Sequence, residues 1–398
     1  MSSLLTAAER LDRAEALLQT YLKECVAKAR TTFPPAYKGA KAIAALNPTG
    51  TPNSYQGVFP EDFFDAVRAG HFFTDEELTD LVEFLTDSIV DLPFLPDNVQ
   101  WDGMPGFAFG GEFSMTGIRM TMAMLHGWVQ MLILFEERGI KIPQKKRWLG
   151  VCRRSLADLS FSCGLLYSNP NIPHVTYGYH DIVEITGFEL MTSVLTCRSL
   201  EQMCDLFAEE ADEEERADWR RRADGIRRNI LRLFDDERGI YYAGSFGCRQ
   251  PDIWGSGLAA GISNKETRAA IAKFYIDHAD DLFFEGMTRQ TDTAEGWEKL
   301  MIPWYGKGEY MHGGFWAKGS SYVLPVLYEF YPDFALDMLD ALVESLPKYH
   351  FCECVSANDH SEKCPYFHSS ISSNIFAIRA MRQGLQLFDT IGCAGSGR

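Results

Sequence analysis

The sequence predicts an all-α fold made of paired helices in a single domain. Apolar residues recur at helical spacing along most of the 398-residue chain, as at Leu78, Leu81, Val82 and Leu85. Alternating strand patterns are almost absent, which argues against a βαβ architecture. No Pro/Ser-rich linker and no abrupt change of composition divides the chain. Long loops rich in Gly, Pro and aromatic residues separate the helices, and we expect them to gather at one end.

Capping signals and apolar stripes place the individual helices. Thr74-Asp-Glu-Glu77 is a capping box, in which the first and last side chains bond each other's backbone N–H groups. Ser263-Asn-Lys-Glu266 repeats this pattern, and Pro332-Asp333 starts a later helix. The expected helices cover residues 3–30, 74–89, 117–138, 146–166, 187–209, 211–236, 263–275, 318–330, 332–346 and 370–388.

Composition and charge exclude several classes of protein. A net charge of −17 argues against nucleic acid or an anionic membrane surface as a partner, because both need a basic face. No apolar window reaches the length of about 18 residues that a membrane-spanning helix needs. The first residues lack the basic and apolar regions of a signal peptide. The ten cysteines show no disulfide-framework spacing, so we expect a cytoplasmic protein.

The loops concentrate acidic, aromatic and glycine residues together. The segments with this composition are Tyr55–Phe64, Pro96–Gly103, Gly178–Gly187, Arg249–Gly255, Gly308–Trp316 and Phe351–Cys354. Hydrolysis of a glycosidic bond needs two carboxyl groups that flank the bond, and aromatic rings pack well on sugar faces. The loop composition therefore suits a carbohydrate-active enzyme.

The order of these segments is similar to that of a known family. An acidic-aromatic segment, Glu61-Asp62-Phe63-Phe64, opens an early helix, and Gly178-Tyr-His-Asp181 forms a central Gly-x-x-Asp loop before an acidic helical hairpin. A short apolar segment at Asp252–Gly261 and a Gly-aromatic helix start at Gly313–Leu324 follow. In this order the chain resembles the six-hairpin (α/α)6 glycosidases, especially the trehalase and processing α-glucosidase clan.

The resemblance implies an (α/α)6 toroid and a mechanism. The toroid would cover residues 55–390, with an N-terminal helix and lead-in loop in 1–54 and a flexible tail at 391–398. The family mechanism is inversion without a metal or cofactor, in which Asp181 protonates the leaving oxygen and Glu353 activates water. The substrate would be a small oligosaccharide or glycoside. The residues expected to bind substrate or orient the acids are Asp62, Trp101, Asp102, Tyr177, His180, Glu184, Arg249, Asp252, Trp254, His312 and Trp316.

Other interpretations of these residues stay open. Asp181 would equally suit a helix cap, and Glu184 would then take its place as the acid. Glu353 would equally suit a structural ion pair. A sugar epimerase or polysaccharide lyase would use His180, His312 or Tyr310 as the proton shuttle instead. A non-catalytic carbohydrate-binding toroid would keep the aromatic residues while the two acids do not face each other.

Two further motifs suggest metal chemistry but have simpler explanations. Thiols and imidazoles cluster at Cys352, Cys354, Cys364, His350, His360 and His368. Their spacing is not the paired C-x2-C form of zinc sites, so reduced loop thiols are the favoured interpretation. Asp280–Glu285 matches the acidic metal motif of terpene cyclases, but a convincing second motif is missing, and we expect a helix end there.

Overall fold

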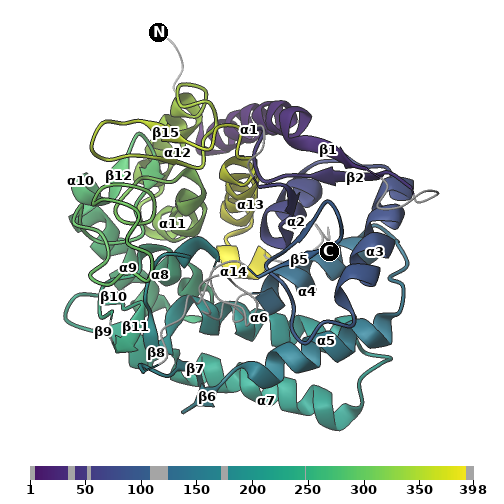
Figure 1. Ribbon diagram of the computed structural model, residues 1–398. Helices are drawn as coiled ribbons and strands as arrows, with labels where there is room; N and C mark the ends of the chain where they lie inside the picture. Colours follow the sequence, from purple (N-terminus) through teal and green to yellow (C-terminus); the bar gives the residue numbers. More distant parts are fainter. Residues whose placement is uncertain are drawn as a thin grey trace.

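The computed structural model describes residues 5–34, 41–51, 55–107, 124–171, 178–246 and 248–390. Within these ranges, twelve main helices form two concentric rings (Figure 1). The inner ring consists of α2 (Pro60–Ala69), α4 (Met124–Glu137), α6 (Leu190–Leu206), α8 (Ile253–Ala259), α11 (Ala317–Phe330) and α13 (Ser369–Gln383). The outer ring consists of α1 (Ala7–Ala29), α3 (Asp75–Ile89), α5 (Lys145–Asp158), α7 (Glu213–Asn229), α9 (Lys265–Asp277) and α12 (Pro332–Ser345).

The inner ring closes on itself. Each inner helix contacts the next one along the chain, and α13 contacts α2, so the ring has no free edge. The first helix of the chain, α1, packs on α13 and α12 and supplies the outer partner of the last hairpin. The arrangement is an (α/α)6 toroid, as the sequence predicts.

Burial separates the inner helices from the outer ones. Helix α6 is buried on nearly every face, whereas α7 buries only a stripe that includes Trp219, Ala223 and Ile226. A helix that is covered on all sides needs apolar or small residues around its whole circumference. In α8, a Cβ on Gly257 would lie 2.2 Å from the Tyr322 carbonyl oxygen, so only glycine permits this approach to α11. The buried apolar side chains form one continuous core, to which α1 also contributes.

Short helices and strands occupy the connections. The short helices are α10 (Ala279–Leu282), α14 (Leu387–Thr390) and the 3-10 turns η1 (Gly178–His180), η2 (Ile230–Leu233) and η3 (Ala260–Ile262). The strands are β1 (Arg30–Phe33), β2 (Ile43–Leu46), β3 (Gly57–Val58), β4 (Asn98–Gln100), β5 (Pro105–Gly106), β6 (Phe161–Ser162), β7 (Leu165–Ser168), β8 (Thr186–Glu189), β9 (Phe234–Asp235), β10 (Ile240–Tyr241), β11 (Gly244–Phe246), β12 (Phe283–Phe284), β13 (Met287–Thr288), β14 (Cys354–Val355) and β15 (Glu362–Lys363).

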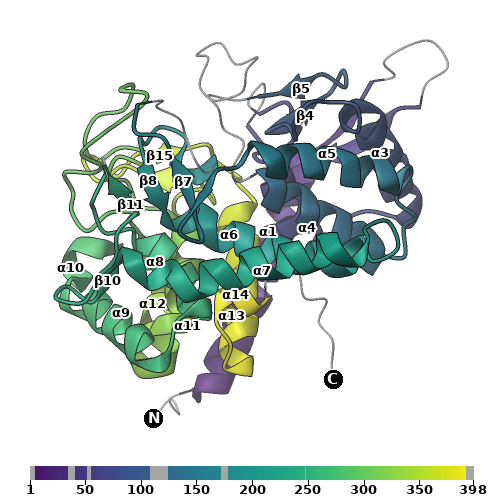
Figure 2. The same ribbon diagram turned by 90° about the horizontal axis from the view of Figure 1, so that it is seen from below.

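These strands lie in the loops, and several of their hairpins gather at one end of the toroid (Figure 2). The pairings recorded between the described strands are all antiparallel, so the expected absence of a βαβ architecture is confirmed for the described part. None of these strands exceeds four residues, which is too short for an alternating pattern to stand out in the sequence. No helix within the described ranges is both long and apolar enough to span a membrane.

One predicted helix start is confirmed and a second is shifted. The Thr74 hydroxyl accepts from the Glu77 backbone N–H, and the Glu77 carboxylate accepts from the Thr74 N–H at 2.9 Å. The capping box at Ser263 is wrong by one residue. Asn264 is the cap of α9, and its side chain accepts from the Thr267 N–H at 2.8 Å.

Two predicted helices end earlier than expected. The helix expected over 146–166 ends at Asp158, because Leu159 adopts an extended backbone with a ψ of 129°. The chain then turns back between β6 and β7 at Cys163 and Gly164, whose φ angles of 51° and 79° are left-handed. The helix expected over 370–388 breaks at Gly384, whose φ of 64° separates α13 from α14. Residues 117–123 of another expected helix lie outside the described residues, and α4 begins at Met124.

Candidate active site

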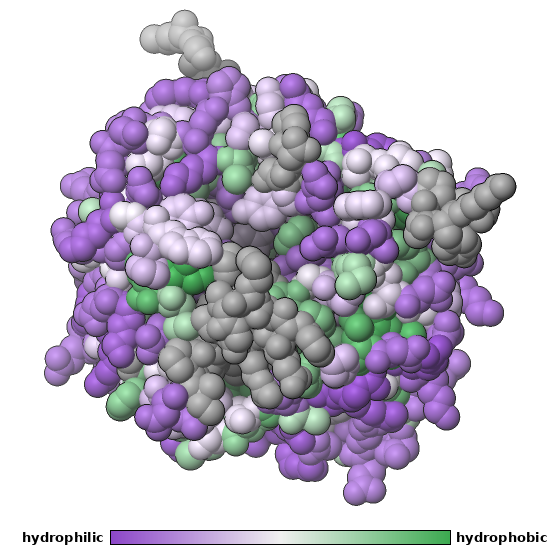
Figure 3. All heavy atoms as spheres, in the orientation of Figure 1, coloured by the Kyte–Doolittle hydropathy of each residue, from purple (hydrophilic) through white to green (hydrophobic). Residues whose placement is uncertain are grey.

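A cavity of about 160 Å³ lies at the N-terminal end of the inner helices. Its walls come from the starts of α2 and α4 and from the loops that precede α6, α11 and α13. Figure 3 views the loop face of the molecule, where hydrophilic side chains dominate the margins and hydrophobic ones lie nearer the middle. The residues that line the cavity are Tyr55, Phe59, Pro60, Glu61, Asp62, Asp97, Asn98, Met124, Tyr179, Asp181, Tyr310, Glu353 and Phe367.

Asp181 follows the η1 turn and reaches this cavity from the loop before α6. The Tyr310 hydroxyl donates to its Oδ2 at 3.3 Å, and its Oδ1 is buried without a hydrogen-bond partner among the described residues. Burial, and to a smaller extent the charge of Asp97, raise the pKa of Asp181 to about 8. The hydrogen bond from Tyr310 opposes this rise. A carboxyl group with this raised pKa holds its proton at neutral pH and is suited to act as a general acid.

Glu353 reaches the same cavity from the loop before α13. Burial raises the pKa of Glu353 to about 8, hydrogen bonds from Cys364 and Tyr55 oppose the rise, and the charge of Asp181 adds to it. The Oε2 atom of Glu353 is buried without a hydrogen-bond partner in the described part of the chain. Because the charge of Asp181 disfavours the charge of Glu353, the two protons leave in separate steps that belong to the pair. Between these steps the pair holds one proton, which is the state that an acid and a base together require.

Three more carboxyl groups line the cavity. Asp62, in the first turn of α2, accepts hydrogen bonds from the hydroxyls of Tyr179 and Ser369. Burial raises the pKa of Asp97 to about 7, and burial raises that of Glu61 well above its usual value. The described lining therefore carries five carboxyl groups and neither Lys nor Arg.

The structure brings together Asp62, Asp181 and Glu353 but places two predicted tryptophans in the core. Trp254 and Trp316 are fully buried, and their rings pack against each other at 81° with centroids 5.7 Å apart. The Trp316 indole N–H donates to the Tyr310 carbonyl at 3.2 Å, so it supports the cavity wall from behind. The expectation that both rings stack on a sugar is therefore corrected: their faces are covered by other side chains.

Arg249 and His312 line a different cavity, beside Trp297 and Lys307. The exposed Arg249 guanidinium lies 4.9 Å from the centroid of the Tyr242 ring. His312 Nδ1 accepts from the Trp297 backbone N–H at 3.0 Å and so braces a loop. The structure therefore does not place these two residues in the described lining of the Asp181 cavity, which corrects their expected role.

The remaining predicted residues serve local structure. Asp252 is fully buried and caps α8 by accepting from the Gly255 N–H at 2.7 Å, with His180 Nε2 3.9 Å from its Oδ2. Glu184 forms an ion pair with Lys299 at 3.7 Å. None of these residues belongs to the described lining of the Asp181 cavity, which corrects their expected role.

Two predicted residues lie in the turn between β4 and β5. The exposed Trp101 lines a surface cavity beside β1 and β2, and Asp102 accepts from the Met104 N–H at 3.0 Å within the turn. Trp101 and Asp102 therefore do not belong to the described lining of the Asp181 cavity, where they were expected to bind substrate. Tyr177 lies outside the described residues.

Sequence reasoning did not select Asp97, Tyr55 or Tyr179. All three lie in loops whose composition suits a sugar site, but within those loops they differ little from the other acidic and aromatic residues. Tyr310 entered only as an alternative proton shuttle. No local signal separates these residues from their neighbours, because what unites them is the meeting of four loops in space.

The cysteine cluster does not form a metal site in the described structure. Cys352 and Cys354 are buried, and Cys364 is partly buried; all three are free thiols. Among residues 5–34, 41–51, 55–107, 124–171, 178–246 and 248–390, no three His, Cys, Asp or Glu side chains are grouped for metal binding. The acidic motif Asp280–Glu285 forms the end of α10 and the start of β12, and Glu285 pairs with Lys348.

The buried carboxyl groups predict that stability falls as the pH rises. A carboxyl pKa that is raised by folding contributes stability below its unfolded value of about 4, and this contribution is lost as the pH approaches the folded value. The folded values are about 7 for Asp97 and about 8 for Asp181 and Glu353. We therefore expect the free energy of unfolding, measured by urea titration, to decrease between about pH 6.5 and about pH 8.

The buried histidines do not change the expected pH dependence between about pH 6.5 and about pH 8. Burial lowers the pKa of His126 and His180 to about 3, so the stability that they contribute is lost only below their unfolded value of about 6.5. Asp181→Asn and Glu353→Gln should each reduce the slope between pH 6.5 and 8. Equal slopes in the wild type and both variants would contradict the prediction.

Comparisons with known proteins agree with this architecture. The search of protein-family models and the search of curated proteins found no match. Among solved structures, the chain is similar to a GH63 mannosylglycerate hydrolase from Thermus thermophilus in complex with glucose, with a TM-score of 0.56 and 13% identity over 90% of this chain and 99% of that one. It is also similar to a bacterial glucoamylase complexed with acarbose, with a TM-score of 0.58 and 11% identity over 96% of this chain and 57% of that one.

A third similar structure is a rhamnosidase from Klebsiella oxytoca with rhamnose bound, with a TM-score of 0.57 and 10% identity over 94% of this chain and 64% of that one. At these identities the likeness concerns the fold, and the fold hosts more than one chemistry. The chain therefore has the (α/α)6 toroid fold of the six-hairpin glycosidases, as the sequence resemblance implies.

Proposed function

We propose that the protein is an inverting glycoside hydrolase that acts on a small oligosaccharide or glycoside. The observation that carries the proposal is the meeting of Asp181 and Glu353, from loops far apart in the sequence, in one buried cavity. The similar solved structures are glycosidases, two of them with a sugar bound, which supports a carbohydrate as the substrate.

In the proposed reaction, Asp181 gives its proton to the glycosidic oxygen as the bond to the anomeric carbon breaks. Glu353 takes a proton from the water that attacks the opposite face of that carbon, which inverts its configuration. Asp62 accepts a hydrogen bond from a sugar hydroxyl. The oxygen atoms of the remaining carboxyl groups carry partial negative charge, which favours the positive charge that develops on the sugar ring in the transition state.

The charge of the cavity favours a neutral substrate. Its described lining contains five carboxyl groups and no Lys or Arg, so it offers an anionic sugar no cationic partner, and any carboxyl group that ionises repels such a sugar. No histidine belongs to the described lining either, which weighs against an epimerase or lyase with His180 or His312 as the proton shuttle. Tyr310, the third residue named for that role, does line the cavity.

We also propose a reducing compartment such as the cytoplasm, with no nucleic acid or anionic membrane as partner. The cysteines of the described residues form no disulfide, and the buried ones pack in the hydrophobic core. Four of these seven buried cysteines lie in helices, at Cys25, Cys152, Cys197 and Cys204. The net charge of −17 supports the exclusion of polyanionic partners.

A panel of glycosides tests the proposed function. We expect the wild-type protein to release sugar from at least one neutral glycoside, with proton NMR showing that the first anomer formed is opposite to that of the substrate. Release of the same anomer would refute inversion. Failure to cleave every glycoside of a panel that covers both anomers would refute the proposed function.

A further inference from the structure

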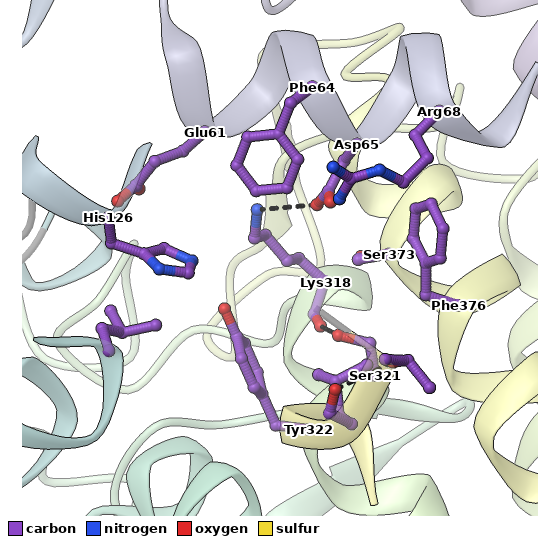
Figure 4. Close-up of a pocket in the computed structure, with 13 residues that line it drawn as sticks. Glu61, Phe64, Asp65, Arg68, His126, Lys318, Ser321, Tyr322, Ser373 and Phe376 are labelled. Atoms are coloured by element: carbon purple, nitrogen blue, oxygen red, sulfur yellow. Dashed lines mark hydrogen bonds and ion pairs between the residues drawn. The ribbon is translucent and has the colours of Figure 1, made fainter. Parts of the chain in front are cut away.

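A buried lysine lies directly behind the wall of the candidate active site. Lys318, in the first turn of α11, is only 3% exposed and faces a second, smaller cavity of about 40 Å³ on the axis of the toroid (Figure 4). The walls of this axial cavity come from α2, α4, α6, α11, α13 and α14. Glu61 lines both cavities, so the two adjoin at this residue.

The lysine is linked to the active-site cavity by two hydrogen bonds in series. Lys318 Nζ donates to the Tyr179 hydroxyl at 2.9 Å and lies 4.0 Å from the centroid of the same ring. The Tyr179 hydroxyl in turn donates to Asp62 Oδ1. Both Tyr179 and Asp62 line the cavity that contains Asp181 and Glu353.

The closest polar partner of the ammonium group is therefore this tyrosine and not a carboxylate. The Asp65 Oδ2 lies 3.8 Å from Lys318 Nζ, as the dashed line in Figure 4 marks. That distance is longer than an ordinary hydrogen bond. Burial of an ammonium group costs free energy unless its N–H groups donate hydrogen bonds. The hydrogen bond to Tyr179 is therefore the contact that offsets part of this cost for Lys318.

The charge of Lys318 strengthens the hydrogen bond that Tyr179 donates to Asp62. A phenol that accepts a hydrogen bond from a cation becomes a better donor, because hydrogen bonds in a chain polarise one another. The only other donor to the same oxygen among the described residues is the Ser369 hydroxyl, which is neutral. Lys318 is thus the one cation connected by hydrogen bonds to the described, cation-free lining of the active-site cavity.

We propose that Lys318 is a positioning residue, which acts through the Tyr179 hydroxyl to hold Asp62 in the orientation that binds a sugar hydroxyl. This inference rests on the proposed function, since Asp62 binds sugar only if the cavity takes a glycoside. Lys318 itself does not contact the substrate. Its side chain lies on the axial side of Tyr179, and the Tyr179–Asp62 bond carries its effect.

A double-mutant cycle tests this role. Lys318→Met keeps the length of the side chain without its charge and is expected to lower kcat/KM about 10- to 100-fold, because a buried hydrogen-bonding group loses its partner. Asp62→Asn is expected to lower it by at least as much. The double variant should be no worse than Asp62→Asn alone, since residues that act through one another are not additive.

Controls separate this role from a structural one. Ser321→Ala alters the same axial cavity and removes a hydroxyl that donates only to the Lys318 carbonyl, so it should leave kcat/KM close to the wild-type value. If Lys318→Met does not fold, Tyr179→Phe breaks the same chain and should show the same lack of additivity with Asp62→Asn. Thermal unfolding of each variant establishes that it is folded before its activity is compared.

Two outcomes would overturn the inference. Losses of Lys318→Met and Asp62→Asn that multiply would show that the lysine acts independently of Asp62. A folded Lys318→Met variant with wild-type kcat/KM, in a protein whose activity depends on Asp181, would refute the inference and leave the proposed function intact. If the wild type cleaves no glycoside, both fall together.

Discussion

Asp181→Asn is expected to lower kcat by about 10²–10⁴-fold on glycosides with poor leaving groups, while KM changes little. The amide keeps the shape of the carboxyl group and can still bond the Tyr310 hydroxyl, but it has no proton to give to the leaving oxygen. The loss should be smaller on activated aryl glycosides, because their leaving oxygen needs less protonation. Steady-state kinetics on a series of leaving groups measures this dependence.

Glu184→Gln is the matched control for this variant. Glu184 lies three residues after Asp181, but its carboxylate pairs with Lys299 and does not line the cavity. We expect the control to keep nearly wild-type turnover on every leaving group. If Glu184→Gln shows the leaving-group dependence and Asp181→Asn does not, the acid is misassigned.

The sequence could predict the helical fold because periodicity and caps are local. Thr74 and Glu77 bond each other within one turn, and the stripe of Leu78, Leu81 and Leu85 follows from the same helix. The boundaries that failed depend on single backbone conformations. Gly384 ends α13 through a left-handed φ, and nothing in the composition around it distinguishes this glycine from one that a helix tolerates.

Only part of the candidate site could be predicted from the sequence. Asp62, Asp181 and Glu353 were selected because the order of elements in the chain resembles a family, and the structure places all three on one cavity. Trp254 and Trp316 were selected by residue type, and a tryptophan next to glycine serves a core as well as a sugar site. Arg249 and Asp102 share a loop character with the site, but the direction in which their loops turn is set by tertiary packing.

Lys318 is a residue whose proposed role the sequence does not reveal. In the sequence it is one charged residue among small and apolar residues. A stretch of this composition is expected to be buried, and a buried position is unusual for a lysine. The structure explains the exception by the hydrogen bond to Tyr179, which comes from a loop more than a hundred residues earlier in the chain. A contact between two residues so far apart in the chain cannot be predicted from a single sequence.

Glu353→Gln is expected to slow every substrate by about 10²–10⁴-fold, whatever its leaving group, because water must be activated in each case. The amide keeps the shape of the carboxyl group and one acceptor oxygen, so the loop before α13 should keep its conformation. A kcat that falls by the same factor across the leaving-group series is the pattern that distinguishes a base from the acid at Asp181.

Glu362→Gln is the matched control for the base. Glu362 lies in β15, which pairs with β14 beside Glu353, but its carboxylate bonds His350 at 2.8 Å at the surface. We expect it to leave turnover nearly unchanged. Azide should restore part of the activity of Glu353→Gln on activated glycosides, because a small anion attacks the anomeric carbon without a base and gives the inverted glycosyl azide. A Glu353→Gln variant with near-normal turnover would move the role of base to Asp97, the other carboxyl group in the cavity whose pKa burial raises to about 7.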